Sequence, residues 1–540
     1  MFDLGRSLLA AVERSPGRTA VVDGTRDFTY ARWYDVVQRA AAGLERLGVR
    51  HGDRLLIVMQ NRWQMAALHW ACQCAGIVAT PLNWRSTAEE IGYCLEDASA
   101  AAIAFDAVAT EAVLACPGAR AIPRIAVGAA GADDADGGAD GGRAPRDDAD
   151  ADGCTSWHAL VAEAPSKPIQ RAAPDDLSVM LYTSGTTGRP KGVPRRHRAE
   201  RAAAIAHVAQ NLYRLGETTL GVMPLYHTMG VRSLLSMALT DGGFVCQPRF
   251  DPAGALEAIE THRVTNLYLV PTLFHLLLEH RDFSSERVAS VTKLGFAGAP
   301  MSDGLLRRVI EGFHPTLFVN HYGSSEIYTF TIDQDAAAKP GSSGRAALNQ
   351  RVRVVPIGAE DARESVPAGT EGEIVADLAG DEAFEGYWNR PDADARSLRD
   401  GWYFTGDSGY FDDEGDLFVT GRVDDLIISG GENVSPADVE NALSTHPDVE
   451  EVAVAGIADE RWGKLVTAFV KPRRDVDEGA LDEHCRISGL ANYKRPRRYV
   501  FVVEIPKSPV GKILRRELVA GNYDEIETAD GAAPRPSEDL

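Results

Sequence analysis

The sequence predicts an α/β protein with a large N-terminal domain of helix-covered, largely parallel sheets and a small, mobile α+β domain at the C-terminus. Three observations support this fold class. The chain has 540 residues, which is more than one compact core usually holds. Apolar strands alternate with helical patterns through most of the chain, and near residue 421 this alternation gives way to a compact α+β pattern.

The alternation begins with residues 54–60 (RLLIVMQ), which predict a strand, and continues with a helical pattern in RWQMAALHWACQCAG. Residues 77–83 and the following TAEEIGYCLEDA repeat it. Further apolar runs lie at 177–183, 242–248, 266–272 and 291–298. Strands that alternate with helices form parallel sheets covered by helices. Ligands in such folds bind at the carboxyl ends of the strands.

A domain boundary is expected near residues 421–425. The segment GRVDDLIISGGENVSPADVENAL predicts a short turn, a strand, a glycine pair and a helix, and three apolar strands follow in VEEVAVAGI, LVTAFVKP and RRYVFVVEIP. We therefore expect an N-terminal domain over residues 1–423 and a mobile C-terminal domain over 424–520. Residues 127–153 are almost only Gly, Ala, Asp and Arg, so they predict a disordered acidic insertion, and 521–540 predict a disordered tail.

Composition and charge exclude several classes of protein. Hydrophobic residues make up 44% and charged residues 25%, as in ordinary globular chains. No apolar run reaches the ~20 residues of a membrane span. Charged residues from Asp3 to Arg14 predict an amphipathic helix rather than a secretory signal, and hence a cytoplasmic protein. A net charge of -22 argues against nucleic acid or an anionic membrane as a partner.

The 7 cysteines show no paired C-x-x-C motifs. Zinc binding is therefore disfavoured, and reduced thiols are expected.

Residues 182–192 (YTSGTTGRPKG) directly follow a predicted strand. Hydroxyls and backbone N–H groups of such a segment can wrap a phosphate chain, and a lysine adds a point charge. The spacing differs from the G-x-x-x-x-G-K-[ST] of nucleotide P-loops. An ordinary polar turn is the alternative, and the length of the motif argues against it. The expected phosphate-binding residues are Thr183, Ser184, Gly185, Thr186, Thr187, Gly188 and Lys191.

This segment resembles the phosphate-binding signature of the adenylate-forming superfamily, which includes acyl- and aryl-CoA synthetases, peptide-synthetase adenylation domains and firefly luciferase. Four further segments resemble the motifs of that family in the family's order, namely NHYGSSE (320–326), YFTGD (403–407), GRVDD (421–425) and PKSPVGK (506–512). Ser325 stands where the family usually has Thr, and the hydroxyl is kept. The chain is most similar to the 4-chlorobenzoate/benzoate:CoA ligase branch, through GRVDDLIISGGEN, DERWGKLVTAFV and ANYKRPRRYVF.

The resemblance implies an acid–CoA ligase that uses ATP, Mg²⁺ and coenzyme A and acts through an acyl-adenylate. A carboxylate must attack the α-phosphorus of ATP, so two anions meet and need neutralising. By resemblance, Glu326 holds Mg²⁺, Ser325 contacts the α-phosphate and Lys512 bridges the carboxylate and phosphate oxygens. The remaining nucleotide roles implied are adenine stacking by Tyr322, ribose binding by Asp407 and ribose support by Arg422.

A thiol then attacks the adenylate. The resemblance implies that the C-terminal domain rotates about Asp424, which withdraws Lys512 and brings Gly430 and Gly431 to a narrow pantetheine tunnel, where backbone without Cβ fits. An ordinary β-bulge is the alternative for this glycine pair. The residues implied in gripping the CoA nucleotide are Trp462, Tyr493, Arg495 and Arg497, for which a solvated basic face is the alternative.

The acid pocket is expected only from the resemblance. His227 is implied to gate the tunnel, and the pocket is implied to be lined by Thr228, Met229, Tyr268, Thr272, Ala297, Gly298, His321, Gly323 and Tyr328. An aryl ring needs apolar walls and small residues where it enters. Thr228, His321 and Tyr328 add polar groups, either as readers of the substrate or as structural groups with partners of their own.

We therefore expect a CoA ligase for an aromatic acid, with small-molecule acid, ATP and CoA as its partners. The alternatives are a fatty or alicyclic acid CoA ligase, an adenylation enzyme that loads a carrier protein, a luciferase-like oxygenase and a non-catalytic acid-binding protein. The CoA-binding set argues against carrier loading, and the presence of Lys512, Asp407 and Glu326 argues against a non-catalytic protein. The acid itself and the oligomeric state, for which a homodimer is one option, stay open.

Overall fold

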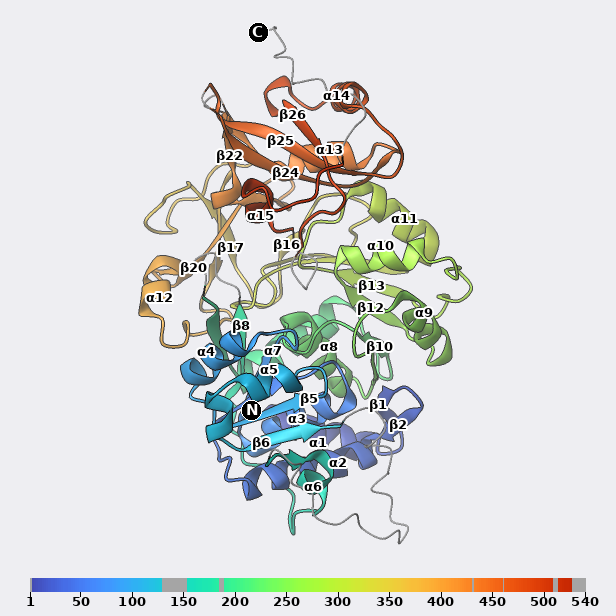
Figure 1. Cartoon of the computed structure of the whole chain (residues 1–540), viewed down its shortest axis with the longest axis vertical. Coiled ribbons are helices and arrows are strands. Elements are labelled where there is room, and N and C mark those ends of the chain that lie inside the picture. Colours follow the sequence, from blue (N-terminus) through green and yellow to red (C-terminus); the bar gives the residue numbers. More distant parts are fainter. Residues whose placement is uncertain are drawn as a thin grey trace.

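The computed structural model confirms the predicted architecture, with a large α/β domain and a small α+β domain at the C-terminus (Figure 1). It describes residues 2–128, 153–183, 189–429, 432–459, 461–507 and 513–526. Most of the expected acidic insertion and most of the expected tail lie outside the described residues. So do several expected site residues, namely Ser184, Gly185, Thr186, Thr187, Gly188, Gly430, Gly431 and Lys512.

Two expected boundaries shift by a few residues. Val127, which composition placed in the insertion, ends strand β6 (Arg124–Val127). At the other end, the N–H of Ile526 donates to the carbonyl of Phe501 at 2.8 Å, and the N–H of Val503 donates to the carbonyl of Asp524 at 2.9 Å. Pairing with folded backbone thus recruits residues that composition assigned to the tail, and the C-terminal domain extends at least to residue 526.

The first large sheet has the strand order β7-β6-β5-β3-β4-β8-β9. Its neighbours pair in parallel except for the hairpin of β8 and β9. The strands predicted at 54–60, 77–83 and 177–183 are confirmed. The remaining bounds are β3 (Arg54–Val58), β4 (Val78–Leu82), β5 (Ala102–Asp106), β7 (Thr155–Ser156), β8 (Leu177–Thr183) and β9 (Lys191–Arg196).

The second large sheet has the order β16-β15-β14-β13-β12-β10-β11-β1-β2. Its central strands are parallel, and antiparallel strands close both edges. The strands predicted at 242–248, 266–272 and 291–298 are confirmed. The bounds are β1 (Thr19–Asp23), β2 (Arg26–Thr29), β10 (Thr218–Gly221), β11 (Gly243–Cys246), β12 (Asn266–Leu269), β13 (Lys293–Phe296), β14 (Leu317–Tyr322), β15 (Thr331–Asp333) and β16 (Arg345–Ala346).

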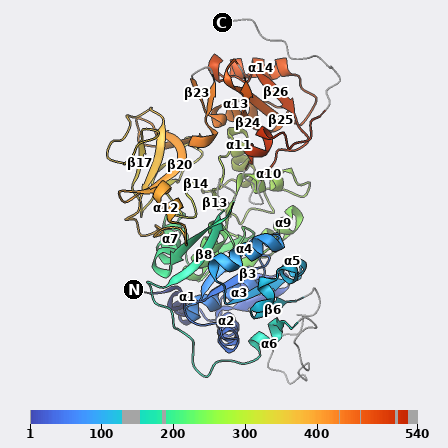
Figure 2. The same ribbon diagram turned by 60° about the vertical axis from the view of Figure 1, so that its left-hand side comes forward.

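Helices cover these sheets, and Figure 2 shows α1 to α4 gathered around β3 and β8. The helix α3 is buried along its whole length, including its polar residues Gln64, His69 and Gln73. Among the described helices, none is long and apolar enough to cross a membrane. The bounds are α1 (Leu4–Arg14), α2 (Tyr30–Arg46), α3 (Trp63–Ala75), α4 (Ala88–Ala98), α5 (Thr110–Ala115), α6 (Trp157–Val161), α7 (His197–Gln210), α8 (Thr228–Leu239), α9 (Pro252–Thr261), α10 (Pro271–Glu279), α11 (Asp303–Phe313) and α12 (Pro391–Ser397).

The local sequence explains where several helices begin. The hydroxyl of Thr87 accepts the N–H of Glu90, and the Glu90 carboxylate accepts the N–H of Thr87, which forms a capping box at the start of α4. Asp3 caps α1 in the same way by accepting the N–H of Arg6. The segment predicted to be an amphipathic N-terminal helix is therefore α1, whose buried residues include Leu4, Leu8 and Ala11.

A third, five-stranded sheet leads to the C-terminal domain. It pairs β17 (Val352–Val355), β18 (Gly372–Asp377), β20 (Trp402–Phe411), β19 (Leu398–Arg399) and β21 (Leu417–Arg422). The C-terminal sheet contains β22 (Ile427–Ser429), β23 (Glu432–Val434), β24 (Val449–Asp459), β25 (Gly463–Pro472) and β26 (Arg498–Phe501), with α13 (Pro436–Ser444), α14 (Glu478–Ile487) and α15 (Arg515–Val519). The seven cysteines of the chain are buried thiols.

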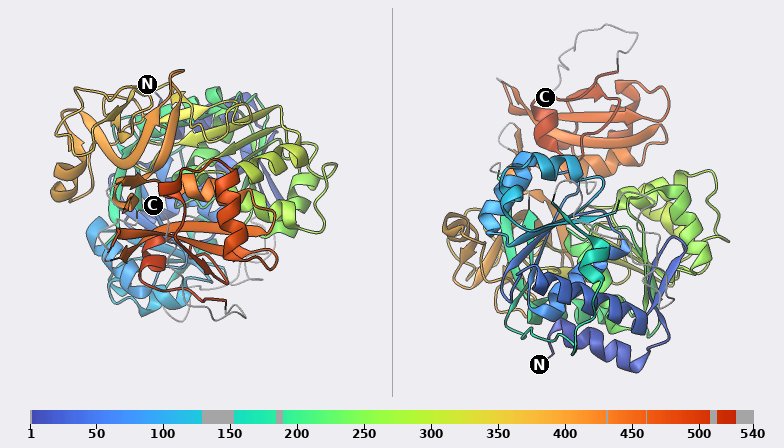
Figure 3. Two further views of the ribbon diagram at one scale, coloured as in Figure 1. Left: turned by 90° about the horizontal axis from the view of Figure 1, so that it is seen from above. Right: turned by 60° about the horizontal axis from the view of Figure 1, so that its bottom comes forward.

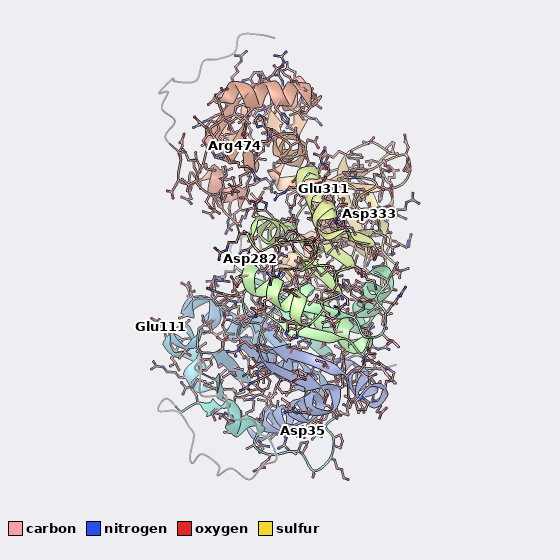
Figure 4. The ribbon with its side chains drawn as sticks, turned by 90° about the vertical axis from the view of Figure 1, so that its right-hand side faces the viewer. Asp35, Glu111, Asp282, Glu311, Asp333 and Arg474 are labelled. Carbon is pink, nitrogen blue, oxygen red and sulfur yellow. The ribbon has the colours of Figure 1, made fainter. Side chains whose placement is uncertain are left out.

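The C-terminal domain lies over one end of the N-terminal domain in the right-hand view of Figure 3. Arg473 directly follows β25, and its Nη1 lies 3.5 Å from Oε1 of Glu279 at the end of α10. The same carboxylate oxygen pairs with Arg308 of α11 at 2.5 Å. Figure 4 shows this side of the molecule, with Glu311 labelled on α11 and Arg474 in the domain above it. The contact between the domains here is polar and exposed, which is typical of an interface that can separate.

Candidate active site

Four parallel strands of the second sheet bring most of the expected pocket residues to one edge. Strands β10, β12, β13 and β14 are neighbours, and their carboxyl ends point the same way. His227 follows β10, Tyr268 lies in β12, Ala297 follows β13 and His321 lies at the end of β14. The pairing of Leu269 with Phe296 and of Phe296 with Asn320 aligns these ends. The structure thus gathers residues far apart in sequence where ligands of such sheets bind.

The glycine- and threonine-rich segment connects the paired strands β8 and β9. Thr183 stands opposite Lys191 in this hairpin, so the phosphate-binding residues expected at 184–188 join two adjacent strand ends. The base of the hairpin is anchored, because the Tyr182 hydroxyl donates to Asp97 Oδ2 at 2.6 Å and the Tyr93 hydroxyl donates to the carbonyl of Pro190 at 3.0 Å. Burial, with help from Asp97, raises the pKa of Tyr182, so it remains a donor.

Glu326, the expected magnesium ligand, is held from two directions. Its carboxylate Oε1 accepts from the Tyr387 hydroxyl at 2.7 Å, and its backbone carbonyl accepts from Arg195 at 2.9 Å. Glu326 is 6% exposed, and among the described residues no donor engages its Oε2. The carbonyl of Ser325 also accepts from Arg195, at 3.4 Å. Hard cations such as Mg²⁺ prefer carboxylate oxygen, so Glu326 fits the metal that the resemblance implies.

Lys191, at the start of β9, lies close to Glu326 without forming an ion pair with it in the described structure. Its Nζ stands 4.3 Å from the centre of the Tyr387 ring. Burial lowers the pKa of Lys191, and the nearby Glu326 carboxylate opposes that change. A half-buried ammonium over a neutral ring keeps its charge available for an anion.

The expected ribose site forms where β20 and β21 pair. Asp407 stands opposite Arg422 in the register, and Arg422 Nη1 donates to Asp407 Oδ1 at 2.7 Å. The hydroxyl of Tyr322 donates to the other carboxylate oxygen at 2.6 Å. A glycine is needed beside them, because Gly406 has φ +70° and a Cβ there would lie 2.9 Å from Arg422 Nη2. Three residues from three motifs thus form one hydrogen-bonded set.

Tyr403 lies between the contacts around Glu326 and the hydrogen-bonded set around Asp407. Its hydroxyl lies 3.5 Å from that of Tyr387, and its ring packs against Phe330, which in turn contacts Tyr322. Burial raises the pKa of Tyr403 well above its usual value, with further contributions from Glu326 and Asp407. The expected phosphate end and the expected ribose end are therefore adjacent.

His227 stands immediately before α8, and Thr228 and Met229 form the first turn of that helix. Burial lowers the pKa of His227 to about 4, so the imidazole is neutral near pH 7. Met229 is buried, whereas Thr228 is partly exposed. The turn is tight, because a Cβ at Gly230 would lie 2.2 Å from the carbonyl oxygen of Pro224.

Two of the polar side chains expected to read the acid, those of Tyr328 and His321, have protein partners. The Tyr328 hydroxyl donates to Glu200 Oε2 at 3.0 Å, and His321 Nε2 lies 3.2 Å from Asn211 Oδ1. The Tyr268 hydroxyl accepts from Arg232. Among the described residues, His321 Nδ1 is buried without a partner. The alternative that Tyr328 is a structural polar group is therefore supported by its hydrogen bond to Glu200.

The small residues of the expected pocket lie where backbone must pass closely. Gly298 has φ +85°, and a Cβ there would lie 3.3 Å from Val270 Cγ1. A Cβ at Gly323 would lie 2.1 Å from the carbonyl oxygen of Tyr328. Ala297 is buried and Thr272, in the first turn of α10, is partly buried. A larger residue at Gly298 would displace the side chain of Val270, and a larger residue at Gly323 would displace the backbone at Tyr328.

The expected CoA residues are brought together only in part. Arg497 lies over the ring of Trp462, with its guanidinium carbon 4.2 Å from the ring centre. Tyr493 is 43% exposed, and Arg495 pairs with Asp482 at 3.1 Å. The backbone of Asp424, the expected hinge, lies in the short 3₁₀ turn Val423–Asp425. Trp462 and Arg497 thus form a joint surface, whereas Arg495 already has an acidic partner.

Sequence reasoning missed a buried set of charges below this site. Arg195 pairs with Glu200, Arg232 donates to Thr329 and Tyr268, and Glu382 is fully buried. Burial raises the pKa of Glu382. Arg232, which stands inside an apolar stretch, was the available signal in the sequence, but its partners Thr329 and Tyr268 lie far away along the chain.

Another acidic cluster, formed by Asp412, Glu414 and Asp416, could in principle hold a cation. Lys339 already occupies it, with Nζ 2.9 Å from Glu414 and 2.7 Å from Asp416 and also in contact with Asp412. An internal ammonium thus neutralises this cluster.

Comparison with known proteins agrees with this arrangement. A model of the AMP-binding enzyme family matches residues 8–388, and a model of the AMP-binding enzyme C-terminal domain matches residues 438–512. A 4-chlorobenzoate–CoA ligase from Arthrobacter is 40% identical over 64% of this chain and 66% of its own length. A feruloyl-CoA synthase from Amycolatopsis is 33% identical over 95% of this chain and 98% of its own. The long-chain-fatty-acid–CoA ligase FadD13 of Mycobacterium tuberculosis is 30% identical over 96% and 98%.

A solved structure shows the same fold. The o-succinylbenzoate CoA synthetase from Bacillus subtilis, in complex with its acyl-adenylate intermediate, superposes with a TM-score of 0.78 at 27% identity, covering 95% of this chain and 97% of that one. The chain belongs to the AMP-binding enzyme family, and the three relatives described above are named as CoA ligases or a CoA synthase. The resemblance drawn from the motifs is thereby confirmed.

Proposed function

We propose that the protein joins an aromatic carboxylic acid to coenzyme A, converting acid, ATP and CoA into acyl-CoA, AMP and diphosphate through an acyl-adenylate. One observation carries the proposal most directly. A carboxylate and an ammonium suited to Mg²⁺ and phosphate, Glu326 and Lys191, stand beside a hydrogen-bonded set suited to ribose, with Tyr403 between them. That arrangement suits the two ends of one nucleotide.

In the first half-reaction the acid carboxylate attacks the α-phosphorus and diphosphate leaves. Mg²⁺ held by Glu326 would supply charge neutralisation. Lys191 and the residues at 183–188 would bind the phosphates, and Ser325 would donate to the α-phosphate. Asp407 would accept the ribose hydroxyls, Arg422 would orient Asp407, and Tyr322 would lie against the adenine. Lys512 would bridge the reacting carboxylate and phosphate oxygens.

In the second half-reaction the CoA thiol attacks the adenylate carbonyl and AMP leaves. The neutral His227 stands at the strand edge where the acid and the tunnel would meet. Rotation about Asp424 would remove Lys512 and bring Gly430 and Gly431 to the tunnel. Trp462, Tyr493, Arg495 and Arg497 would hold the CoA nucleotide, and the paired Trp462 and Arg497 are the best supported of these.

An aromatic acid is favoured by the pocket walls and by two relatives. Tyr268, Met229 and Ala297 are buried at the sheet edge, where an aryl ring would find apolar contacts. The chlorobenzoate and feruloyl relatives are named for aromatic acids. A fatty acid is the second candidate, because another relative over almost the whole chain is named for long-chain fatty acids. A carrier-loading enzyme is a third candidate, since ScoC of Streptomyces coeruleorubidus, 31% identical, is named for loading an acyl carrier protein.

The deciding experiment is a panel of acids tested for acid-dependent exchange of diphosphate into ATP and for acyl-CoA formation. The panel contains benzoate, hydroxy-, amino- and halobenzoates, cinnamates and medium-chain and long-chain fatty acids. We expect both activities with aromatic acids and a higher kcat/KM for them than for fatty acids. Transfer to a phosphopantetheinyl carrier but not to free CoA would instead favour carrier loading. Trp462→Ala should raise the KM for CoA and leave diphosphate exchange unchanged.

We further propose that the enzyme works in the cytoplasm with soluble substrates and without nucleic acid or membrane partners. The charge of -22 argues against nucleic acid or an anionic membrane as a partner. A homodimer remains one option for its assembly, and light scattering after size exclusion would measure it.

A further inference from the structure

Tyr387 contacts both charged groups of the expected phosphate end. It lies between β18 and α12 and is 6% exposed. Its hydroxyl donates to Glu326 Oε1 at 2.7 Å, and its ring centre lies 4.3 Å from Lys191 Nζ. One side chain thus holds a carboxylate at its edge and an ammonium over its face.

The position of Tyr387 is itself fixed by neighbouring contacts. Its N–H donates to Asp394 Oδ1 at 2.8 Å, and its ring packs against Phe384 with centres 5.0 Å apart. The N–H of the next residue, Trp388, donates to the carbonyl of Gly192 at 2.9 Å. The segment is therefore tied to β9, the strand that begins with Lys191. Residues that orient a metal ligand need this kind of rigid support.

We propose that Tyr387 is a positioning residue that orients Glu326 for Mg²⁺ and Lys191 for phosphate while keeping their charges apart. This proposal rests on the proposed function, in which Glu326 holds the metal. A hydrogen bond to one oxygen of a ligating carboxylate fixes its rotamer and leaves the other oxygen for the cation. The ring offers Lys191 a neutral partner. If Lys191 instead paired with Glu326, each charge would be neutralised before the nucleotide arrived.

The competing explanation is that Tyr387 only packs. It belongs to a buried cluster with Phe330, Phe384 and Tyr403, so its loss would lower stability in either case. Tyr30 provides a matched control, because it is 2% exposed and its hydroxyl donates to the carbonyl of Gly242 at 2.8 Å. Both Tyr→Phe variants remove one buried hydroxyl from a ring that stays in place.

The test measures Mn²⁺ binding by electron paramagnetic resonance in the presence of ATP and without acid or CoA. Mn²⁺ serves as the probe for Mg²⁺, and the full chain is used. For Tyr387→Phe we expect the apparent Kd for Mn²⁺ to rise about tenfold, as for other residues that orient metal ligands. Its metal-free ATP affinity should stay unchanged. Tyr387→Leu should also weaken metal-free ATP binding a few-fold, because the contact with Lys191 is lost. Tyr30→Phe should change neither value.

Three results would overturn the proposal. Mn²⁺ affinity of Tyr387→Phe within about twofold of wild type would show that the hydroxyl does not orient Glu326. Equal losses in Tyr387→Phe and Tyr30→Phe would show a purely structural role. Absence of an ATP-dependent Mn²⁺ site in the wild type would remove the metal role of Glu326 as well. A wild type that binds Mn²⁺ with ATP but ligates none of the acids would refute the proposed function alone.

Discussion

At the residue scale, the expected ribose site is pre-arranged by its own hydrogen bonds. Asp407 accepts from Tyr322 and Arg422, so its carboxylate is fixed before ribose could arrive. Burial raises the pKa of Tyr322 well above its usual value, and Asp407 adds to this, so the phenol stays a donor. Such pre-orientation lowers the entropy cost of binding a ligand.

Lys512 lies outside the described residues, and its role can be tested by separating the two half-reactions. Lys512→Ala should abolish acyl-AMP formation, because the positive charge between the two reacting anions is lost. Thioester formation from supplied acyl-AMP should remain largely intact, because the lysine is expected to have left the site. The two rates would be measured by diphosphate exchange and by acyl-CoA release. A similar loss in both half-reactions would contradict the assigned role.

The polar residues of the expected acid pocket predict a preference among ring substituents. Hydroxy- or aminobenzoates should be used about 10–100-fold better than 4-chlorobenzoate, because an unpaired buried polar group costs ~1–3 kcal/mol. The readout is kcat/KM for a matched series of acids on the wild type and on His321→Ile. This substitution should reduce the ratio of kcat/KM between the polar acids and 4-chlorobenzoate.

Tyr328→Phe is the control for that series. Its hydroxyl serves Glu200, so we expect a loss of about 1–3 kcal/mol in the free energy of unfolding with little change in the ratio between acids. A wild type that uses 4-chlorobenzoate as well as the polar acids would refute the polar-pocket interpretation.

Three histidines with lowered pKa values predict a loss of stability in weak acid. Burial lowers the pKa of His69 to about 3 and those of His197 and His227 to about 4. Each imidazole is neutral in the folded state but takes up a proton in the unfolded chain below its ordinary pKa of about 6.5. The free energy of unfolding should therefore fall between pH 6.5 and pH 4, by up to ~1.4 kcal/mol per pH unit for each group.

Urea unfolding at pH 7 and pH 5 would measure this loss. His69→Gln should make the free energy of unfolding less dependent on pH. His314→Asn, at an exposed position, should leave that dependence as in the wild type. An equal slope in His69→Gln and wild type would show that His69 is not one of the responsible groups.

At the element scale, the site depends on the connections at the strand ends rather than on the strands themselves. The carboxyl ends of β10, β12, β13 and β14 carry the residues expected to line the pocket, and the β8–β9 hairpin carries the expected phosphate loop. The acidic insertion occupies a different connection, between β6 and β7, which pair in parallel with Ile125 opposite Thr155. Two parallel strands need a connection that returns the chain from the end of one strand to the start of the next. If the insertion only provides this return from β6 to β7, its amino-acid composition is unimportant.

Replacing residues 130–152 with a Gly/Ser linker of about ten residues should therefore leave folding intact and kcat within a few-fold. The short linker keeps enough chain for the return from β6 to β7. Thermal unfolding and the acid-dependent activity would be measured together. A large fall in either one would show that the insertion has a structural or catalytic role.

At the scale of the whole molecule, the two domains have separate cores. The buried clusters around Ile427, Val454 and Phe469 contain residues of the C-terminal domain only. The larger clusters are formed by residues of the N-terminal domain. Contacts across the boundary include the exposed Arg473–Glu279 pair and the Ser435 hydroxyl, which donates to the carbonyl of Thr420. Weak contacts between independent cores permit the rotation that the proposed function requires.

A chain truncated to residues 1–423 should consequently fold and bind ATP, because it keeps Asp407, Arg422 and Glu326. It should not form acyl-AMP, because Lys512 is absent. Circular dichroism and ATP titration would test the first expectation, and diphosphate exchange would test the second. An unfolded product would show that the C-terminal domain contributes to the N-terminal core, and full exchange activity would show that Lys512 is dispensable.

The sequence alone determined the fold class, the alternation of strands and helices along the chain and the family, because these depend on local periodicity and on short motifs of fixed spacing. It also indicated Glu326, Asp407, Arg422 and Lys512 through such motifs. Only the tertiary structure decided which polar groups are paired. Tyr387 reaches Glu326 and Tyr328 reaches Glu200 across long stretches of chain. The order of strands within each sheet and the packing of helices bring such partners together, and neither leaves a spacing pattern in the sequence.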